Sequence, residues 1–261
     1  MKKALAKKPL GQNFLCDEQI LEAIIKSIPK LNKGVEIIEI GAGLGDLTNK
    51  LLSLGNITAY EVDRDLIPHL KERFWEVLEN GKLKLEIGDI LEVWKERSLR
   101  KNPYFLVSNL PYYIATLLVL KAIKDPMCQG CVVMTQKEVA LKFCAVCKEV
   151  NFSALSVLAG SVGEAKLLFC VPKEAFIPQP KITSAVFLIQ KTKDLEPDFL
   201  EHLERLLKIS FAMPRKTLQN NLNKGFDKDK VEQAFKALKI DSKRRPHEID
   251  ISTYHRLLNF L

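Results

Sequence analysis

Residues 35–45 read VEIIEIGAGLG and decide the fold expected for this chain. The stretch begins with β-branched and acidic residues that predict a strand, and glycines follow at positions 41, 43 and 45. Residues 46–54 then have the spacing of a helix. A buried strand that runs into a glycine-rich turn and a helix opens a nucleotide-binding α/β sheet, because the missing side chains let a ligand approach the backbone. We therefore expect an α/β fold.

Two carboxylates at strand ends narrow the choice of nucleotide. Glu61 lies twenty residues beyond Gly41, at the end of the strand expected at 58–61. A carboxylate there can accept hydrogen bonds from both ribose hydroxyls, which would also serve a nicotinamide dinucleotide. However, Glu39 at the end of the first strand is badly placed for a pyrophosphate and acceptable beside an ammonium or sulfonium group. The pair favours S-adenosyl-L-methionine as the cofactor.

Two further strands also end in polar side chains. Residues 83–90 read LKLEIGDI, where Asp89 could accept from an adenine amino group and the amide of Ile90 could face a ring nitrogen. The alternative is an ordinary turn, since Gly-Asp is common between a strand and a helix. Residues 104–107 predict the next strand, which ends near Asn109. Because successive parallel strands end at one edge of a sheet, we expect these side chains to share a ligand site.

Residues 108–113 read SNLPYY and carry the chemistry that a purine base would need. Pro111 disfavours a helical conformation at the preceding residue, so the Leu110 carbonyl and the Asn109 amide can point into one space. Tyr112 supplies a flat face beside these two acceptors. The alternative is a strand-to-helix turn that Asn109 caps.

The rest of the chain completes the sheet and then changes character. Further strands are expected at 132–135, 164–170 and 184–190. The proline-rich loop 171–181 holds Phe176, which could form the second wall of a base pocket or anchor the loop to the core. Residues 7–15 precede an amphipathic helix at 17–27 and could either cover a ligand or simply lead into that helix. After residue 191 the apolar spacing is that of helices only.

Composition and charge bound the class of protein. The chain has 261 residues, of which 47% are hydrophobic and 28% charged, as in ordinary soluble globular proteins. Apolar runs fall short of a membrane span and the N-terminus lacks a signal-peptide pattern, so we expect a cytoplasmic protein. The net charge of +8 comes from residues 1–10, with four lysines and no acid, and from residues 191–261, with 15 basic and 11 acidic side chains. A neutral body with basic ends suits contact with phosphate backbones.

The cysteines form a pattern that resembles a metal site. Cys128 and Cys131, and Cys144 and Cys147, are two Cys-x2-Cys pairs, which is close to a four-thiolate zinc pattern. A strand and a helix are expected to fill the spacing, so free thiols in a reducing compartment are the favoured interpretation and no metal is predicted.

Across nearly its whole length the chain resembles the ribosomal RNA adenine N6,N6-dimethyltransferases that modify small-subunit RNA. The residues that carry the resemblance are 11–15 (GQNFL), 39–43 (EIGAG), 109–112 (NLPY), 136–139 (QKEV), 176–181 (FIPQPK), 184–186 (SAV) and 215–217 (RKT). The resemblance implies a Rossmann-like seven-stranded methyltransferase sheet in a catalytic domain, residues 1–191, and a small all-helical domain, residues 192–261, that contacts the RNA or the ribosome. It also implies a monomer that acts on two adjacent adenosines in a hairpin loop near the 3′ end of 16S ribosomal RNA, within the immature 30S subunit.

The resemblance also assigns site residues. S-adenosyl-L-methionine is expected at Gln12, Asn13, Leu15, Gly41, Gly43, Glu61, Asp89, Ile90 and Asn109. For the transfer itself, Asn109 and the Leu110 carbonyl are expected to hold the amino group, and Tyr112 and Phe176 to stack the base. The expected RNA contacts are Lys7, Lys8, Arg215, Lys216, Lys243, Arg244 and Arg245.

Two departures and two alternatives accompany this interpretation. Tyr113 stands where the family often has Asn, and Pro214 precedes Arg215 where a second basic residue is common. The related enzymes that dimethylate a large-subunit adenosine share the core motifs, although residues 215–217 and the basic joints of the helical part argue for the small subunit. An RNA-binding assembly factor that has kept a cofactor fold is the alternative outside enzymes.

Overall fold

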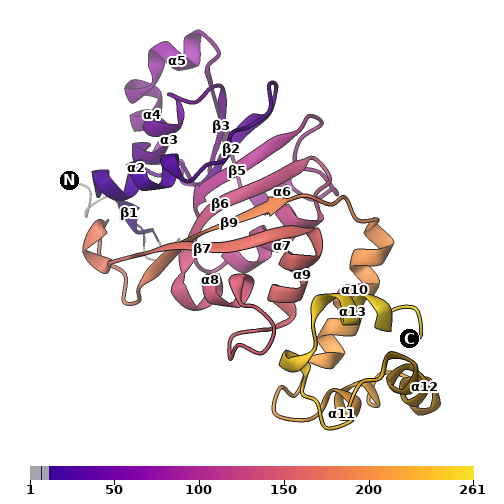
Figure 1. The fold of residues 1–261 in the computed structure, drawn as a ribbon. Coiled ribbons are helices and arrows are strands. Elements are labelled where there is room, and N and C mark those ends of the chain that lie inside the picture. The colour runs from indigo at the N-terminus through magenta and orange to yellow at the C-terminus, as the bar shows by residue number, and fades with distance from the viewer. Residues whose placement is uncertain (1–6, 8–11) are drawn as a thin grey trace. The chain divides into compact units, whose positions relative to one another are not determined.

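The computed structural model describes Lys7 and residues 12–261 (Figure 1). Its main sheet has seven strands in the order β4-β3-β2-β5-β6-β9-β7. The strands are β2 (Glu36–Ile40), β3 (Ile57–Glu61), β4 (Leu83–Ile87), β5 (Tyr104–Asn109), β6 (Cys128–Gln136), β7 (Gly163–Val171) and β9 (Ser184–Lys191). Strands β2 to β6 pair in parallel, and β9 runs antiparallel to β6. The α/β sheet expected from the sequence is confirmed.

Helices cover both faces of this sheet, which explains the continuous apolar runs of its central strands. The helices of the first part of the chain are α2 (Glu18–Lys26), α3 (Asp46–Leu51), α4 (Ile67–Arg73), α5 (Trp75–Glu79), α6 (Ile90–Val93), α7 (Ala115–Lys124) and α8 (Lys137–Cys144). In β5, Phe105 and Val107 belong to the core cluster that includes side chains of α2, α3 and α4. Tyr104, which precedes Phe105, points to the other face, where its ring meets that of Trp94 edge-on with the ring centres 6.4 Å apart. Strand ends are therefore held rigidly from both sides.

A two-stranded sheet that sequence reasoning did not anticipate joins distant segments. Strand β1 (Phe14–Leu15) pairs antiparallel with β8 (Phe176–Ile177), with Leu15 opposite Phe176. The amide of Cys16 also donates to the Ala175 carbonyl at 2.8 Å, next to the short 3-10 helix η2 (Lys173–Ala175). The segment after Gln12 is thus fixed to the proline-rich loop.

The chain divides into two compact units, and their bounds differ from the expected division after residue 191. One unit runs to Ala140 and includes Lys166–Lys191; the other comprises Leu141–Ala165 and Thr192–Leu261. The second unit holds α9 (Ala154–Val162), α10 (Pro197–Ser210), α11 (Leu218–Leu222), α12 (Lys228–Leu238), the 3-10 helix η3 (Pro246–Glu248) and α13 (Ile251–Leu257). Residues 141–165 join it because α9 packs on α13: Ser161 Oγ lies 2.7 Å from His255 Nε2, and a Cβ on Gly160 would stand 2.4 Å from Ile251 Cδ1.

Within Lys7 and residues 12–261, no helix is long and apolar enough to span a bilayer.

Candidate active site

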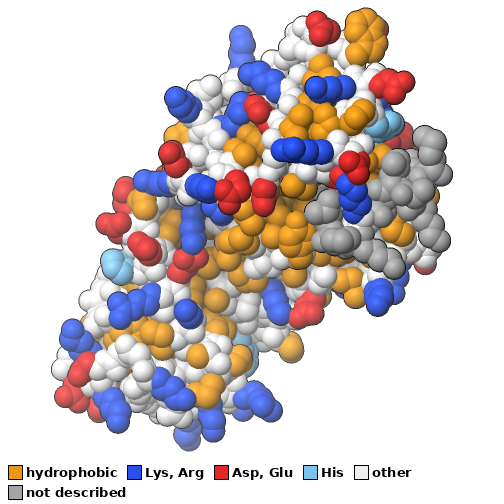
Figure 2. Space-filling model, turned by 180° about the vertical axis from the view of Figure 1, so that it is seen from behind, with side chains coloured by type: hydrophobic (Ala, Val, Ile, Leu, Met, Phe, Trp, Pro, Cys, Tyr) orange, Lys and Arg blue, Asp and Glu red, His pale blue; other side chains and the backbone are white. Residues whose placement is uncertain are grey.

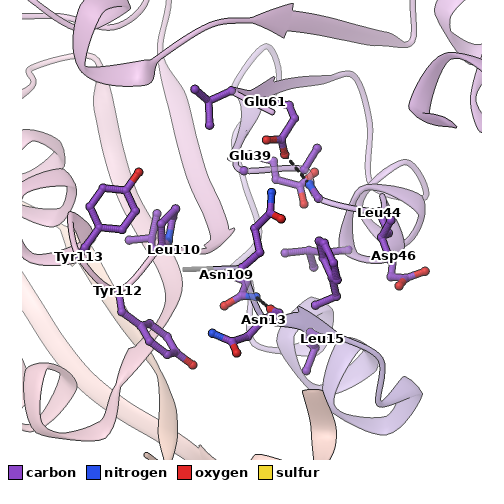
Figure 3. Close-up of a pocket in the computed structure, with 18 residues that line it drawn as sticks. Asn13, Leu15, Glu39, Leu44, Asp46, Glu61, Asn109, Leu110, Tyr112 and Tyr113 are labelled. Atoms are coloured by element: carbon purple, nitrogen blue, oxygen red, sulfur yellow. Dashed lines mark hydrogen bonds between the residues drawn. The ribbon is translucent and has the colours of Figure 1, made fainter. Parts of the chain in front are cut away.

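A pocket lies where β2, β3 and β5 end, within the first unit (Figure 3). The residues that line it are Gln12, Asn13, Phe14, Leu15, Glu39, Gly41, Ala42, Gly43, Leu44, Asp46, Leu47, Glu61, Val62, Asn109, Leu110, Pro111, Tyr112 and Tyr113. Three of them are acidic, and none of the described lining residues is Lys or Arg. An anionic ligand such as a pyrophosphate would find no cationic partner among these described residues, whereas a cationic ligand would be stabilised.

The glycine turn brings bare backbone to the pocket. Gly41 and Gly43 have φ values of +78° and +60°, in the left-handed region that favours glycine. A Cβ on Gly43 would lie 3.2 Å from the Phe14 ring, so the ring packs directly on the turn. The Gly43 amide donates to Glu61 Oε2 at 2.7 Å. The turn therefore helps to orient Glu61, the carboxylate expected to hold the ribose, and it also exposes its own backbone to the pocket.

Glu61 is held in one orientation at the end of β3. It is only 4% exposed, and its other oxygen, Oε1, accepts from the Asp63 amide at 2.8 Å. Burial raises the pKa of Glu61, while the backbone hydrogen bonds from Asp63 and Gly43 oppose that rise. Val62 adds a third backbone hydrogen bond, and a carboxylate has about four lone-pair positions, so the group can still accept from a ligand hydroxyl.

Glu39 is a buried carboxyl that has no cationic partner among the described residues. It is 1% exposed, and Thr48 Oγ1 donates to its Oε2 at 2.5 Å. Burial raises the pKa of Glu39 to about 8, and the negative charge of Glu61 adds to the rise. A positively charged ligand group in the pocket would stabilise the ionised form of Glu39. The ionised carboxylate would in turn stabilise the bound ligand.

The NLPY segment lies on the opposite side of the same pocket. Asn109 Nδ2 donates to the Asn13 carbonyl at 3.2 Å, which directs the amide so that Oδ1 is its remaining acceptor. The Leu110 amide donates to the Met134 carbonyl at 3.1 Å, and Leu110 is 1% exposed, so only its carbonyl can serve a ligand. The Tyr112 hydroxyl lies 2.6 Å from Ser184 Oγ, and this contact fixes the ring. Tyr113, to which sequence reasoning assigned no role, also lines the pocket and is 64% exposed.

Three of the expected site residues do not line the pocket. Asp89 is exposed and caps α6, where it accepts from the Leu91 amide at 2.9 Å, and Ile90 is buried. Burial raises the pKa of the pocket residue Tyr113, and Asp89 is near enough to that phenol to add to the rise, so the contact of Asp89 with the adenine stays a prediction. Phe176 is 1% exposed and belongs to the core cluster, because its pairing with Leu15 turns the ring inward. In this arrangement Phe176 anchors its loop and its ring is not available to stack a base.

Asp63 is the site residue that sequence reasoning missed. It is 2% exposed and accepts from Gln12 Nε2 at 2.9 Å and from Lys7 Nζ at 2.6 Å. The signal that could have found it is a second acid two residues beyond Glu61, in the loop that follows β3.

The expected RNA contacts lie in different parts of the chain. Lys7 is engaged by Asp63 and Asp65, and Lys8 lies outside the described residues. Arg215 and Lys216 are exposed before α11, and Lys243, Arg244 and Arg245 are exposed before η3. The Leu218 amide donates to the Arg244 carbonyl at 2.8 Å, which brings the two basic loops together. On the face drawn in Figure 2, Lys and Arg are more prominent than Asp and Glu over the helical unit.

The four cysteines of the zinc-like pattern are dispersed among regular elements. Cys128 and Cys131 are buried in β6, and Cys144 ends α8. Burial raises the pKa of Cys128 to about 11 and that of Cys144 to about 12, so both are thiols at neutral pH. Within the described part of the chain, no group of three or more His, Cys, Asp or Glu side chains is arranged to hold a metal ion.

The strand order and the pocket at the carboxyl ends of the parallel strands define the class as Rossmann-like α/β proteins, which bind ligands at this edge of the sheet. A profile described as ribosomal RNA adenine dimethylase matches residues 3–261. The ribosomal RNA small subunit methyltransferase A of Helicobacter hepaticus is 47% identical, covering 100% of this chain and 93% of the relative. The protein of that name from Campylobacter hominis is 45% identical, covering 98% of this chain and 96% of the relative.

Solved structures show the same fold. A dimethyladenosine transferase from Plasmodium falciparum matches with a TM-score of 0.77 and 25% identity, covering 94% of this chain and 95% of that one. The 23S rRNA methyltransferase ErmE matches with a TM-score of 0.72 and 23% identity, covering 95% of this chain and 99% of that one. The chain belongs to the ribosomal RNA adenine dimethylase family. The enzyme class expected from the sequence is thereby confirmed.

Proposed function

We propose that the chain transfers methyl groups from S-adenosyl-L-methionine to N6 of two adjacent adenosines near the 3′ end of 16S ribosomal RNA, giving N6,N6-dimethyladenosine. The observation that carries this proposal is the pocket itself, which has carboxylates on one side and the NLPY acceptors and ring on the other. The relatives named as small-subunit methyltransferases support the choice of the RNA.

The lining residues fit this cofactor. Glu61 would accept from the ribose hydroxyls, while the backbone of the Gly41–Gly43 turn allows close approach. Glu39 would ionise when a positive group binds beside it, which suits a ligand that carries ammonium and sulfonium groups. The described lining residues offer no cation for a phosphate. When bound, the cofactor supplies a methyl group on a positively charged sulfur.

The NLPY segment would prepare the nucleophile. The lone pair of an adenine amino nitrogen is delocalised into the ring, so it attacks only if both hydrogens are drawn into a geometry that frees the lone pair. Asn109 Oδ1 and the Leu110 carbonyl would accept those two hydrogens, since Asn13 holds the other end of the Asn109 amide. The N–CH3 bond would form as the S–CH3 bond breaks, which leaves S-adenosylhomocysteine. No strong general base is needed, because the nitrogen becomes acidic as it gains the methyl group and can then lose its proton to water.

Tyr112 would hold the flipped base, an interaction worth roughly 1 to 3 kcal/mol. Its ring already stands in place through the contact of its hydroxyl with Ser184. The joined basic loops at 215–216 and 243–245 would contact RNA phosphates in the immature 30S subunit. We further propose that the chain acts as a monomer in the cytoplasm, where that subunit is assembled.

The test is methyl transfer from labelled cofactor to ribosomal subunits that lack the modification. The expected result is label in 16S RNA as N6,N6-dimethyladenosine at adjacent positions, and Asn109→Ala should still bind cofactor but lose roughly 100-fold or more of the transfer rate at saturating cofactor. Label in large-subunit RNA would favour the alternative enzyme group. Binding of subunits without any transfer would favour an assembly factor, and near-normal turnover by Asn109→Ala would refute the role of that side chain.

A further inference from the structure

Asp63 joins the N-terminal segment to the cofactor pocket. Its carboxylate is 2% exposed, although it lies in a loop. Oδ2 accepts from Gln12 Nε2 at 2.9 Å, and Oδ1 accepts from Lys7 Nζ at 2.6 Å and from the Asp65 amide at 3.1 Å. A buried carboxylate is stable only with such partners, and two of the three come from more than fifty residues earlier in the chain.

Gln12 closes this set of contacts. While its Nε2 donates to Asp63, its Oε1 accepts from the Lys7 amide at 2.7 Å, so both ends of its amide are used. Gln12 itself lines the pocket. The two residues that follow it are also engaged there: the Asn13 carbonyl holds Asn109, and Phe14 packs on Gly43.

The backbone of Asp63 contacts Glu61, a second residue of the cofactor pocket. Its amide donates to Glu61 Oε1 at 2.8 Å, which orients the carboxylate expected to hold the ribose. One residue thus positions Glu61 through its main chain and Gln12 through its side chain. A residue needed only to close the loop after β3 would not require the Gln12 contact.

We propose that Asp63 is a positioning residue whose carboxylate holds Gln12 and the segment after it against the bound cofactor. The identity of that cofactor rests on the proposed function. Asp63 touches no reacting atom, so it should govern how tightly the cofactor is held and leave the transfer step nearly unchanged.

The experiment measures binding of S-adenosylhomocysteine by titration calorimetry without RNA, alongside methyl-transfer kinetics. Asp63→Asn removes the charge that Lys7 pairs with, and Gln12→Met removes both side-chain hydrogen bonds while keeping length and apolar bulk. The matched control is Lys95→Met, which breaks an exposed ion pair with Glu92 in the same unit. Thermal unfolding of all variants reports whether each one folds.

We expect the Kd of S-adenosylhomocysteine and the KM of the cofactor to rise about tenfold or more in Asp63→Asn and Gln12→Met, as for the loss of a hydrogen bond to a charged group. The kcat at saturating cofactor should change less than about twofold, and Lys95→Met should match the parent. The double variant should be little worse than Gln12→Met alone, because Asp63 acts on the cofactor through Gln12 and that contact is already lost in Gln12→Met.

Three results would overturn this role. Unchanged Kd and KM in folded variants, a fall in kcat without a rise in KM, or additive effects in the double variant would each show that the contact does not position the cofactor. If Asp63→Asn fails to fold, the half-exposed Gln12→Met decides the question. If the parent chain itself binds no S-adenosylhomocysteine, the proposed function fails. If the parent binds it and the variants bind it equally well, only the role of Asp63 fails.

Discussion

Glu39→Gln tests whether the pocket is built for a cation. Burial raises the pKa of the Glu39 carboxyl from 4.5 to about 8, so at pH 7 the cofactor-free protein retains a proton that the unfolded chain has lost. Stability should therefore fall as pH rises between these two values, at up to about 1.4 kcal/mol per pH unit and on the order of 4 to 5 kcal/mol in all. Gln mimics the protonated carboxyl in shape, so the variant should lack this part of the pH dependence.

Cofactor binding should reverse the protonation of Glu39. A positive group near the carboxylate lowers its pKa, so binding at pH 7 should release nearly one proton, about 0.9 if the bound pKa falls well below 7. S-adenosylhomocysteine lacks the charged sulfur and should release fewer protons. Glu39→Gln should release none from this site and should bind S-adenosyl-L-methionine more weakly, with a smaller loss for S-adenosylhomocysteine.

The assay pairs denaturant unfolding from pH 5 to 9 with calorimetric binding at pH 7 in two buffers of different ionisation enthalpy. The difference in unfolding free energy between parent and variant should shrink or change sign as pH rises, then level off above pH 8. Equal proton release by parent and Glu39→Gln would refute the reasoning. So would a difference in unfolding free energy that does not vary with pH.

Three further predictions concern the turn, the ring and the basic loops. Gly43→Ala places a Cβ 3.2 Å from the Phe14 ring at a φ of +60°, so cofactor titration should show a Kd raised about tenfold or more, a result that unchanged affinity would contradict. Tyr112→Phe should keep most transfer activity, whereas Tyr112→Ala should lose about 5- to 150-fold in kcat/KM for RNA, in line with lost stacking; equal loss in both would assign the role to the hydroxyl. The double variant Arg215→Gln, Lys216→Gln should lower the slope of log K against log salt for subunit binding by the equivalent of about one to two phosphate contacts, without changing the Kd of the cofactor. An unaltered slope would show that these residues do not contact the RNA.

Sequence patterns predict the central sheet because its signals are local. The run into Gly41 and the position of Glu61 follow from strand periodicity and from the rule that ligands meet parallel strands at their carboxyl ends. The SNLPYY segment is recognisable for a similar reason, since Pro111 restricts its neighbour whatever the rest of the chain does.

The features that the sequence did not reveal depend on contacts between distant segments. Phe176 turns inward because β8 pairs with β1, and nothing near Phe176 in the sequence specifies that partner. The helix α9 joins the helical unit through Ile251 and His255, about a hundred residues away. A division after residue 191, where the sequence pattern changes from strands to helices, therefore assigns α9 to the other unit. Asp63 was missed because its partners Lys7 and Gln12 precede the sheet altogether.

The N-terminal segment explains how the cofactor site and the base site can act together. Gln12 reaches the cofactor side through Asp63, Phe14 packs on Gly43, and between them the Asn13 carbonyl orients the amide of Asn109. An Asn109 amide without that carbonyl could rotate and offer its NH2 group where an acceptor is required. The contact with Asp63 is made by Gln12 and the contact with Asn109 by the Asn13 carbonyl, so loss of the Gln12 contact should weaken cofactor binding while the nucleophile stays aligned. Residues 12–14 therefore serve cofactor binding through Gln12 and Phe14, and methyl transfer through the Asn13 carbonyl.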